Sequence, residues 1–479
     1  MKLVLKFGGT SLGSPKDINS VARTVASFSK DNEIVVVCSA VDGVTDELIL
    51  ISRMIEQRKK DDVNVTLNKL ILRHRSLANK TIKNSEIKKQ LLEKLNTDVS
   101  ELQELVRGLA LLKEVSARSL DYLISFGERL SDDLVSYALQ DLKKKSTALN
   151  GKEVGIVTDS NFGESRPLMD TTRIRISKTL GSLLSKKIIP VVGGFAGADQ
   201  HGNITTFGRG GSDYTATIIA SCINADEVWL MSDVDGLMTA DPKLVKNAKL
   251  LKEVSYSEAI EMAQFGAKQI HPRTFEPLLS KKIPMRIRST FDIKNTGTLV
   301  TAAPSGDQTR IKVGGRSAVS KKTVKCVSAI RNIGLMDLSG GILFAAPGSA
   351  AKIFTILAEK NINVLMVSSN PSESSISIIV KKTDLERAVN ALEMNLLGKL
   401  VKKIETTPNV SIIAMIGSGM RGTVGIASKV FTAAQKRNVN VMMIAQGSSE
   451  LNLAFVVKDS DCKSVVQSLH EEFQLDKIN

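Results

Sequence analysis

The last third of the chain repeats itself, and this repeat limits the folds open to that region. When the sequence is displaced by 77 positions, residues 333–384 align with residues 410–461 without a gap. Gly348 then falls on Gly425. A sequence that repeats at a fixed period uses one supersecondary unit more than once. The repeat therefore predicts two copies of one small module.

Each copy has the pattern strand, glycine loop, amphipathic helix, strand, turn, strand, helix, which is typical of a ferredoxin-like module. The first copy continues into a fourth strand at 401–407, whereas the second stops near Phe473 without one. We predict that a strand-like segment at 323–330 completes the second module, so that the first module is inserted within the second. The predicted divisions are 323–332 for the completing strand, 333–407 for the first module and 408–479 for the second.

The first 300 or so residues alternate strand-like and helix-like segments. Such alternation predicts an α/β domain with a mostly parallel sheet covered by helices. Ligands bind such folds at the carboxyl ends of the strands. The polar stretch 301–310 is expected to be a linker, so the domain should span 1–305. The strand-like runs are 3–7, 33–41, 187–199 and 226–236, and the helix-like runs are 14–30, 46–145 and 213–225.

Composition and spacing argue against several classes of protein. No apolar run approaches the roughly 20 residues that cross a bilayer. The opening MKLVLKFGGTS lacks the features of a secretory signal. The four cysteines form no CxxC pair, so buried free thiols are expected rather than disulfides or a metal site. These features favour the cytoplasm.

The net charge of +15 is unusual and allows two interpretations. The lysines are spread along the chain, and aromatic residues make up only 4%. No aromatic residues are interleaved with basic runs, as base stacking would require. We therefore favour a solvated, lysine-rich surface that attracts anionic metabolites. Binding to nucleic acid is the alternative, and no membrane partner is expected.

A glycine pair follows the first strand-like run, in KFGGTS at 6–11. Phosphates need backbone N–H groups brought close, and glycine has no side chain to obstruct them. Lys6 would place a cation on a transferred phosphoryl group. A strand-end hairpin without a ligand is the alternative.

A second glycine loop, FGRGGSDYTATIIA at 207–220, leads into a helix with Ser212 or Asp213 near its N-cap. The free N–H groups and the dipole of a helix start favour an anion. Arg209 offers a fork suited to a carboxylate. Such a loop can also simply begin a buried helix.

Two further segments are ambiguous on their own. In MSDVDGLMTADPK at 231–243, clustered aspartates could hold ribose or lie near Mg²⁺, or they could be turn and cap residues. In GAKQIHP at 266–272, Lys268 could reach a phosphate, and His271 is expected to be structural. The chain has no Walker A motif and no HRD or DFG set. A GxGxxG match at 417–422 lies inside the repeat, whose other copy lacks it, so we reject a dinucleotide site.

Taken together, these motifs resemble the amino-acid kinase superfamily and, within it, the aspartate kinases. SAVDGVTDEL at 39–48 and ISFGERLSD at 124–132 complete the set, in the order that the family has. The resemblance implies a three-layer sandwich followed by two ACT modules of βαββαβ type. It also implies the monofunctional form, since no dehydrogenase portion follows the second module.

The implied reaction is phosphorylation of the side-chain carboxylate of L-aspartate by MgATP, the first step towards lysine, threonine and methionine. That carboxylate has a pKa of about 4, so it is already a nucleophile at neutral pH. No general base is needed, and catalysis should rest on positioning and on charge neutralisation. The alternatives are a kinase acting on glutamate or acetylglutamate and an inactive amino-acid sensor.

The resemblance also implies a role for individual residues. Lys6 would stabilise charge on the γ-phosphoryl group, with Asp213 as its catalytic companion. Lys243 stands where the family often has arginine, so a bidentate contact is not possible there. Substrate would be held by Ser39, Thr45, Glu128 (through the α-amino group) and Arg209, and ATP by Gly8, Gly9, Ser212, Ser232, Asp233, Asp235, Lys243 and Lys268.

The ACT resemblance implies feedback by an amino acid and assembly into a homodimer or tetramer. Lysine-sensitive relatives carry an aspartate in the strand that corresponds to 363–366, and this chain has no acid there. We therefore expect threonine rather than lysine as the effector. The expected effector-binding residues are Gly348, Ala350, Asn363, Val364, Asn440 and Val441.

Overall fold

The computed structural model describes residues 1–266, 270–302, 312–313, 316–317, 323–340, 347–370 and 375–478. The chain forms two compact units that interleave along the sequence. The first comprises Met1–Leu237, Lys252–Tyr256 and Gln269–Pro304, and the second comprises Met238–Leu251, Ser257–Lys268 and Ser305–Asn479. Most of the predicted linker lies outside the described residues, and the domain boundaries drawn from the sequence remain a proposal.

The first unit is built on an eight-stranded sheet with the order β3-β5-β2-β1-β8-β10-β11-β9. All neighbouring strands are parallel except β10 and β11. A small second sheet has the order β4-β6-β7. The strands are β1 (Lys2–Phe7), β2 (Glu33–Cys38), β3 (Ser146–Leu149), β4 (Val157–Thr158), β5 (Ile189–Gly193), β6 (Ala196–Asp199), β7 (Ile204–Thr206), β8 (Glu227–Ser232), β9 (Glu253–Ser255), β10 (Met285–Ser289) and β11 (Thr298–Thr301).

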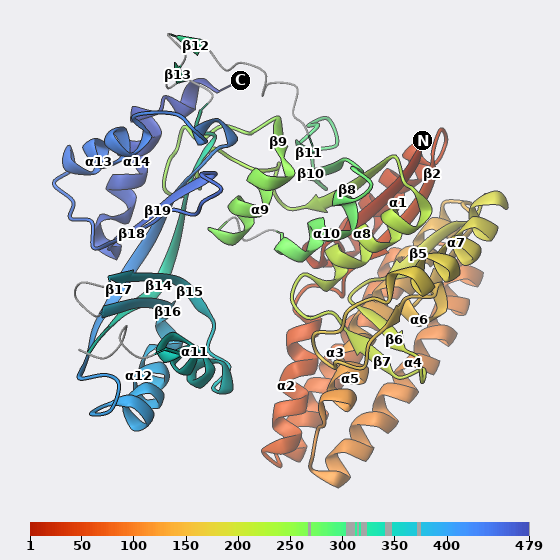
Figure 1. Ribbon diagram of the computed structural model, residues 1–479. Coiled ribbons are helices and arrows are strands. Elements are labelled where there is room, and N and C mark those ends of the chain that lie inside the picture. The colour runs from red at the N-terminus through yellow and green to blue at the C-terminus, as the bar shows by residue number, and fades with distance from the viewer. Residues whose placement is uncertain are drawn as a thin grey trace. The chain divides into compact units, whose positions relative to one another are not determined.

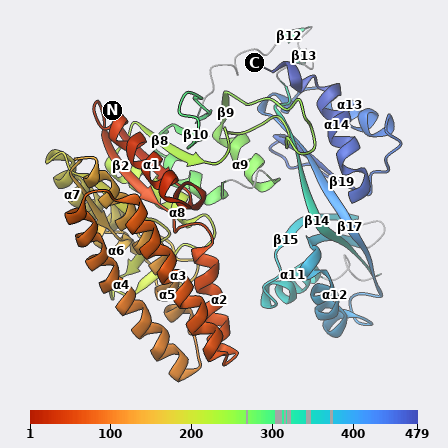
Figure 2. The same cartoon turned by 180° about the vertical axis from the view of Figure 1, so that it is seen from behind.

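Helices cover both faces of this sheet, which confirms the predicted three-layer α/β sandwich (Figure 1). On one face α1 and α5 pack on β2, and α2, α3 and α4 extend this layer (Figure 2). On the other face α8 packs on β1 and β8, with α7 and α10 beside it. The helices are α1 (Pro15–Phe28), α2 (Val44–Glu56), α3 (Lys60–Thr81), α4 (Ser85–Leu112), α5 (Ala117–Asp141), α6 (Gly151–Val154), α7 (Met169–Ser185), α8 (Gly211–Ile223) and α10 (Glu276–Leu279), with 3-10 helices η1 (Gly9–Leu12) and η2 (Pro272–Phe275).

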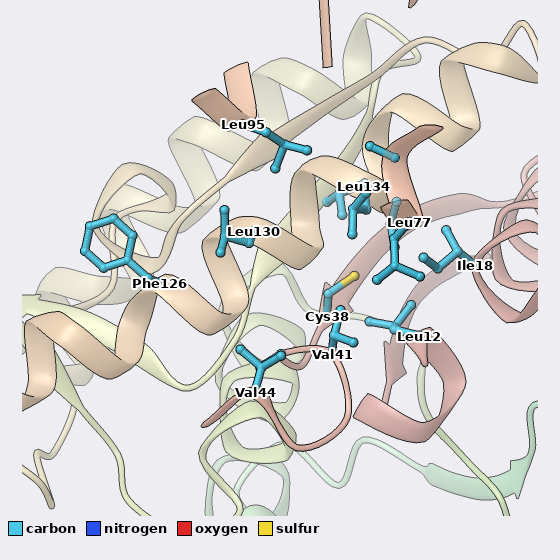
Figure 3. Packing of buried hydrophobic residues seen from close by; sticks show 14 of the residues in the cluster. Leu12, Ile18, Cys38, Val41, Val44, Leu77, Leu95, Phe126, Leu130 and Leu134 are labelled. Atoms are coloured by element: carbon cyan, nitrogen blue, oxygen red, sulfur yellow. The ribbon is translucent and has the colours of Figure 1, made fainter. Parts of the chain in front are cut away.

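Alternation along β1 assigns its side chains to the two faces. Leu3, Leu5 and Phe7 belong to the buried cluster formed with α1 to α5. Cys38 and Leu134 meet in the same cluster (Figure 3). Because successive side chains of a strand point to opposite faces, Lys6 points to the face covered by α8. All four cysteines are buried free thiols, as expected.

The second unit contains a six-stranded sheet with the order β15-β16-β14-β17-β19-β18. The neighbouring strands are antiparallel. Each half of the sheet carries two helices, which confirms the predicted pair of ferredoxin-like modules. The elements are β14 (Cys326–Ser339), α11 (Ser349–Glu359), β15 (Val364–Asn370), β16 (Ser375–Lys381), α12 (Lys382–Leu396), β17 (Lys403–Ile416), α13 (Ile426–Gln435), β18 (Met443–Ala445), β19 (Asn452–Lys458) and α14 (Cys462–Glu472), with the short pair β12 (Lys312–Val313) and β13 (Arg316–Ser317).

Two long strands are shared by the modules. We expected separate strands at 323–330 and from 333, but β14 is continuous across both segments. Its last part pairs with β16, and residues 326–330 pair with 412–416 of β17. A register shift between Ile330 and Ile333 marks the change of module. This register supports the proposal that the early strand completes the second module.

The second unit also takes in two segments that precede the repeat. Ala240 and Val245 belong to the same buried cluster as α14. The helix α9 (Tyr256–Gln264) places Glu258 in full burial, where its carboxylate lies 2.8 Å from the Lys325 ammonium. The same carboxylate accepts a hydrogen bond from the backbone N–H of Ser418. Within the described ranges, none of the helices combines the length and the apolarity needed to cross a bilayer.

One glycine tests the packing of the first unit. A Cβ at Gly151 would lie 1.8 Å from the carbonyl oxygen of Ala196, so the backbone must move to admit it. We expect Gly151→Ala to lower the free energy of unfolding by about 1–3 kcal/mol, the usual cost of overpacking. Gly108 is also helical, and a Cβ there meets nothing within 4 Å, so Gly108→Ala should raise stability by about 0.5–1 kcal/mol. Thermal unfolding of both variants measures the two changes in stability. Equal changes in the two variants would contradict the prediction.

Candidate active site

The loops that carry the predicted site residues emerge from neighbouring strands. β1 lies between β2 and β8, and all three are parallel. Their carboxyl ends therefore lie at one edge of the sheet, which is where ligands bind in folds of this kind. Lys6 and Ser39 lie at or just beyond the ends of β1 and β2, and Ser232 ends β8.

Lys6 is paired with an acidic residue from the first turn of α8. Its ammonium lies 2.5 Å from Oδ1 of Asp213, and both side chains are 11% exposed. The helix begins at Gly211 with Gly210 as its N-cap, so Ser212 and Asp213 lie in the first turn rather than at the N-cap. The ion pair fixes the direction of the ammonium, and the pair keeps a small contact with solvent.

The glycine pair after β1 is enclosed by backbone. A Cβ at Gly9 would lie 2.8 Å from the carbonyl oxygen of Ala40. The N–H of Gly8 donates to the carbonyl of Met231, which ties this loop to β8. Only glycine at position 9 allows so close an approach of the two backbones. The arrangement leaves the loop without side chains where a phosphate would approach.

Ser39, just after β2, contacts Ser212 in the first turn of α8. Their hydroxyl oxygens are 2.7 Å apart. The backbone N–H of Ser39 donates to the carbonyl of Phe7, and the Ser131 hydroxyl donates to the Ser39 carbonyl. The loop after β2 is therefore held on three sides, by β1, α5 and α8.

Glu128 on α5 is a buried carboxyl group with one oxygen unused. Its Oε1 accepts a hydrogen bond of 3.1 Å from the N–H of Ala40, and its Oε2 is buried without a partner. Burial raises the pKa of Glu128 to about 8, while the hydrogen bond from Ala40 and the charge of Lys6 act in the opposite direction. A buried acceptor without a donor is costly, so this oxygen calls for a cationic or hydrogen-bonding ligand.

A cavity of about 820 Å³ opens beside Glu128. The small residues Gly193 and Gly194 form part of its wall, and Arg118 and Lys152 line it further out. A Cβ at Gly193 would lie 2.6 Å from Oδ2 of Asp132, so this wall cannot carry a larger side chain without rearrangement. The cavity is large enough for an amino acid, and Glu128 forms part of its wall.

Other predicted residues have less defined surroundings. Thr45 is half-buried in the first turn of α2, and Arg209 is exposed on the loop between β7 and α8. Ser232 donates through its hydroxyl to Asp233, and both Asp233 and Asp235 have exposed side chains.

Two other lysines are predicted to bind ATP. Lys243 belongs to the second unit, where it is exposed and its N–H donates to Asp241. Lys268 lies outside the described residues. The structure thus brings together Lys6, Gly8, Gly9, Ser39, Glu128, Ser212, Asp213 and Ser232.

The predicted effector residues all lie in the second unit. Gly348 is the N-cap of α11 with a φ of 84°, and Ala350 lies in the first turn of that helix. Asn363 and Val364 lie at the start of β15. Asn440 and Val441 precede β18, which is the matching place in the second module.

Two residues that the sequence did not single out hold the loop of Arg209. Asp121 accepts hydrogen bonds from the N–H groups of Gly163 and Thr206 and from the Thr206 hydroxyl. Arg273 donates to the carbonyl of Phe207 and lies over the ring of Tyr214. Arg273 directly follows GAKQIHP, so that motif contains a hint of it, whereas nothing near Asp121 distinguishes it from other helical acids.

The geometry agrees with the similarity of the chain to known proteins. The amino acid kinase family model matches residues 1–289, and an ACT domain model matches residues 338–396 and 413–473. The bifunctional aspartokinase/homoserine dehydrogenase 2 of Zea mays is 32% identical over 99% of this chain and 51% of its own length. Aspartokinase 1 of Arabidopsis thaliana, named as chloroplastic, is 29% identical over 98% of this chain and 80% of its own length.

Solved structures of E. coli aspartokinase III are similar along nearly the whole chain. The complex with aspartate and ADP has a TM-score of 0.80 at 28% identity and covers 98% of this chain and 99% of that one. The complex with lysine and aspartate has a TM-score of 0.81 at 27% identity, with 98% of each chain covered. The chain spans about half the length of the bifunctional relatives that it matches. Because the family match covers more than half of its residues, the chain belongs to the amino acid kinase family.

Proposed function

We propose that this chain transfers the γ-phosphoryl group of ATP to the side-chain carboxylate of L-aspartate, giving 4-phospho-L-aspartate and ADP. The observation that carries the proposal is Glu128, a buried carboxyl group with one oxygen that has no partner, in the wall of a cavity large enough for an amino acid. A carboxylate in that position suits the α-amino group of a substrate. The aspartokinases that the chain resembles support aspartate as that substrate.

In the proposed mechanism, the substrate supplies its own nucleophile. Its carboxylate is ionised at neutral pH, so the obstacle is repulsion between two anions. Lys6 would move its charge from Asp213 towards the phosphoryl group, and Gly8 and Gly9 would line the phosphates. Arg209 and Thr45 would hold the α-carboxylate, while Glu128 holds the amine. Transfer would then rest on positioning of the two reactants.

Mg²⁺ would neutralise charge on the triphosphate. The exposed carboxylates of Asp233 and Asp235, after β8, fit the preference of Mg²⁺ for one or two carboxylates together with substrate phosphates. Ser232 would hold the nucleotide at the same loop. Lys243 and Lys268 are proposed contacts of ATP on sequence grounds alone.

The proposed place in metabolism is the first step towards lysine, threonine and methionine. An amino acid bound at the ACT modules would regulate it, with the chain assembled as a homodimer or tetramer. The cytoplasmic location stays a prediction, and the alternative substrates are glutamate and acetylglutamate. Glu128 favours a free α-amino group, which acetylglutamate lacks.

The first test is an ATP assay in which hydroxylamine traps the acyl phosphate. L-Aspartate should give signal and L-glutamate little, and the reverse would refute the substrate.

Lys6→Ala should lower kcat by about 100- to 1000-fold, because an oriented cation is lost where charge develops. Lys16 is an exposed lysine of α1, so Lys16→Ala is the matched control and should leave kcat unchanged. An unchanged kcat in Lys6→Ala, with the protein folded by circular dichroism, would refute the role of Lys6.

The raised pKa of Glu128 predicts how aspartate affinity changes with pH. Burial keeps this carboxyl protonated below about pH 8 in the free protein, and an ammonium group needs the ionised form. KM for aspartate should therefore fall about tenfold for each unit of pH as the pH rises towards 8, and then level off. In Glu128→Gln this dependence should vanish and KM should be high throughout. KM for ATP is the internal control, and the same pH dependence in ATP binding would contradict the assignment.

Feedback regulation can be tested by adding L-lysine, L-threonine or L-methionine to the assay. Because residues 363–366 contain no acid to pair with a lysine side chain, we expect L-threonine to inhibit more strongly than L-lysine or L-methionine. Asn363→Ala should weaken inhibition by threonine and leave the uninhibited kcat within about twofold, since a surface substitution away from the site has a small effect. Steady-state assays at a fixed aspartate concentration measure both. Inhibition by lysine alone would overturn the choice of threonine.

A further inference from the structure

Thr290 follows β10 and contacts two loops of the candidate active site. Its side chain is fully buried, and its hydroxyl oxygen lies 2.7 Å from Oγ of Ser11, which is also fully buried. Its backbone N–H donates to the carbonyl of Ser232 at 2.8 Å. A single residue thus bonds to the glycine loop after β1 and to the loop after β8.

The two partners belong to the loops proposed to bind ATP. Ser11 lies in η1, directly after Gly8 and Gly9, and its own N–H donates to the Gly8 carbonyl at 3.0 Å. Ser232 begins the loop that carries Asp233 and Asp235. The covalent length of the nucleotide limits how far the triphosphate can lie from the ribose, so these loops must stay within that distance of each other.

We propose that Thr290 is a positioning residue that sets the separation between the phosphate loop and the nucleotide loop. The proposal rests on the assignment of these loops to ATP. The backbone bond from Thr290 to Ser232 is the last bond of the parallel pairing between β10 and β8. The Thr290 hydroxyl adds the contact with Ser11, which the strand pairing of β10 does not supply, and so links the end of β8 to the loop after β1.

The chemistry of the side chain suits this role. Threonine is stiff at χ1, so its hydroxyl has a defined direction once the methyl group is packed. Both hydroxyls are buried, and removing one leaves the other without its partner, which is more costly than losing an exposed hydrogen bond. Serine keeps the hydroxyl and loses only the methyl group, whereas valine keeps the shape and loses the hydroxyl.

The test compares Thr290→Val with Thr290→Ser. Thr290→Val should lower kcat/KM for ATP by about 5- to 150-fold, the range expected for an orphaned buried hydroxyl. Most of this loss should lie in KM for ATP, and KM for aspartate should change by less than about twofold. Thr290→Ser should recover kcat/KM to within about threefold of the unchanged protein. Calorimetric titration with ADP needs no phosphoryl acceptor. It should show weaker binding of ADP to Thr290→Val than to Thr290→Ser and the unchanged protein, even if the acceptor is not aspartate.

A second buried hydroxyl pair provides the matched control. Thr158 and Thr205 have their hydroxyl oxygens 2.6 Å apart in the small sheet, and neither belongs to the proposed site. Thr158→Val should lower the melting temperature about as much as Thr290→Val and leave ADP affinity intact. An equal loss of ADP affinity in both valine variants, or no difference between Thr290→Val and Thr290→Ser, would overturn the proposal.

Should Thr290→Val fail to fold, Ser11→Ala tests the same contact from its other side. It should weaken ADP binding as Thr290→Val does. In a folded Ser11→Ala/Thr290→Val double variant, the loss should be no greater than in one single variant, since the two act through one contact. Additive losses would show that the two residues act independently and would contradict the proposal.

Discussion

The parallel pairing of β1 with β2 and β8 is the constraint on which the candidate site depends. It brings three chain segments that are far apart in the sequence to one edge of the sheet. The alternation of β1 then gives its odd-numbered side chains to the apolar core and leaves Lys6 on the face of α8. A slip of one residue in this register would turn Lys6 into the apolar core beneath α1 and α5 and would turn Leu5 and Phe7 towards α8.

Charge is distributed around this edge in a way that suits two anionic reactants. The Lys6 ammonium lies 3.8 Å from the place of a Cβ at Gly8, and its partner Asp213 comes from a helix start. On the opposite side, α5 contributes Glu128, which burial keeps in its neutral form. Below about pH 8, Glu128 therefore adds no negative charge that would repel an anionic ligand. Above that pH the carboxyl group ionises and can pair with an ammonium group.

The sequence predicted the parts of the molecule that depend on local pattern. The repeat predicted two modules with two helices each, and the glycine motifs predicted two loops, after β1 and before α8, that the structure joins through Lys6 and Asp213. It missed the contacts that hold these loops, because they depend on the tertiary arrangement. Asp121 and Thr290 have no signal in their own neighbourhoods, and each bonds to residues that are distant in the sequence.

The strand boundaries also depend on tertiary contacts that a local sequence pattern does not reveal. Residues 331–332 look like the end of one strand and the start of another, yet β14 passes through them with a change of register. Asn332 has a φ of 59° at this point, a conformation that asparagine tolerates better than most residues. A local pattern cannot distinguish such a bulge from a turn, because the difference lies in whether the partner strand continues.

The interleaving of the two units has a consequence for the history of this chain. Ala240 and Val245 precede the repeat by many residues, yet their apolar side chains are buried with those of α14. A fragment cut at the linker would expose these two side chains to water. Recombination at the linker therefore could not exchange either unit with all of its buried residues. Substitutions in α14 and in residues 238–251 should therefore have accumulated together. A regulatory half taken from another gene would need this segment as well, and the joints of a functional chimera would have to follow the buried surfaces of the cluster rather than the order of the sequence.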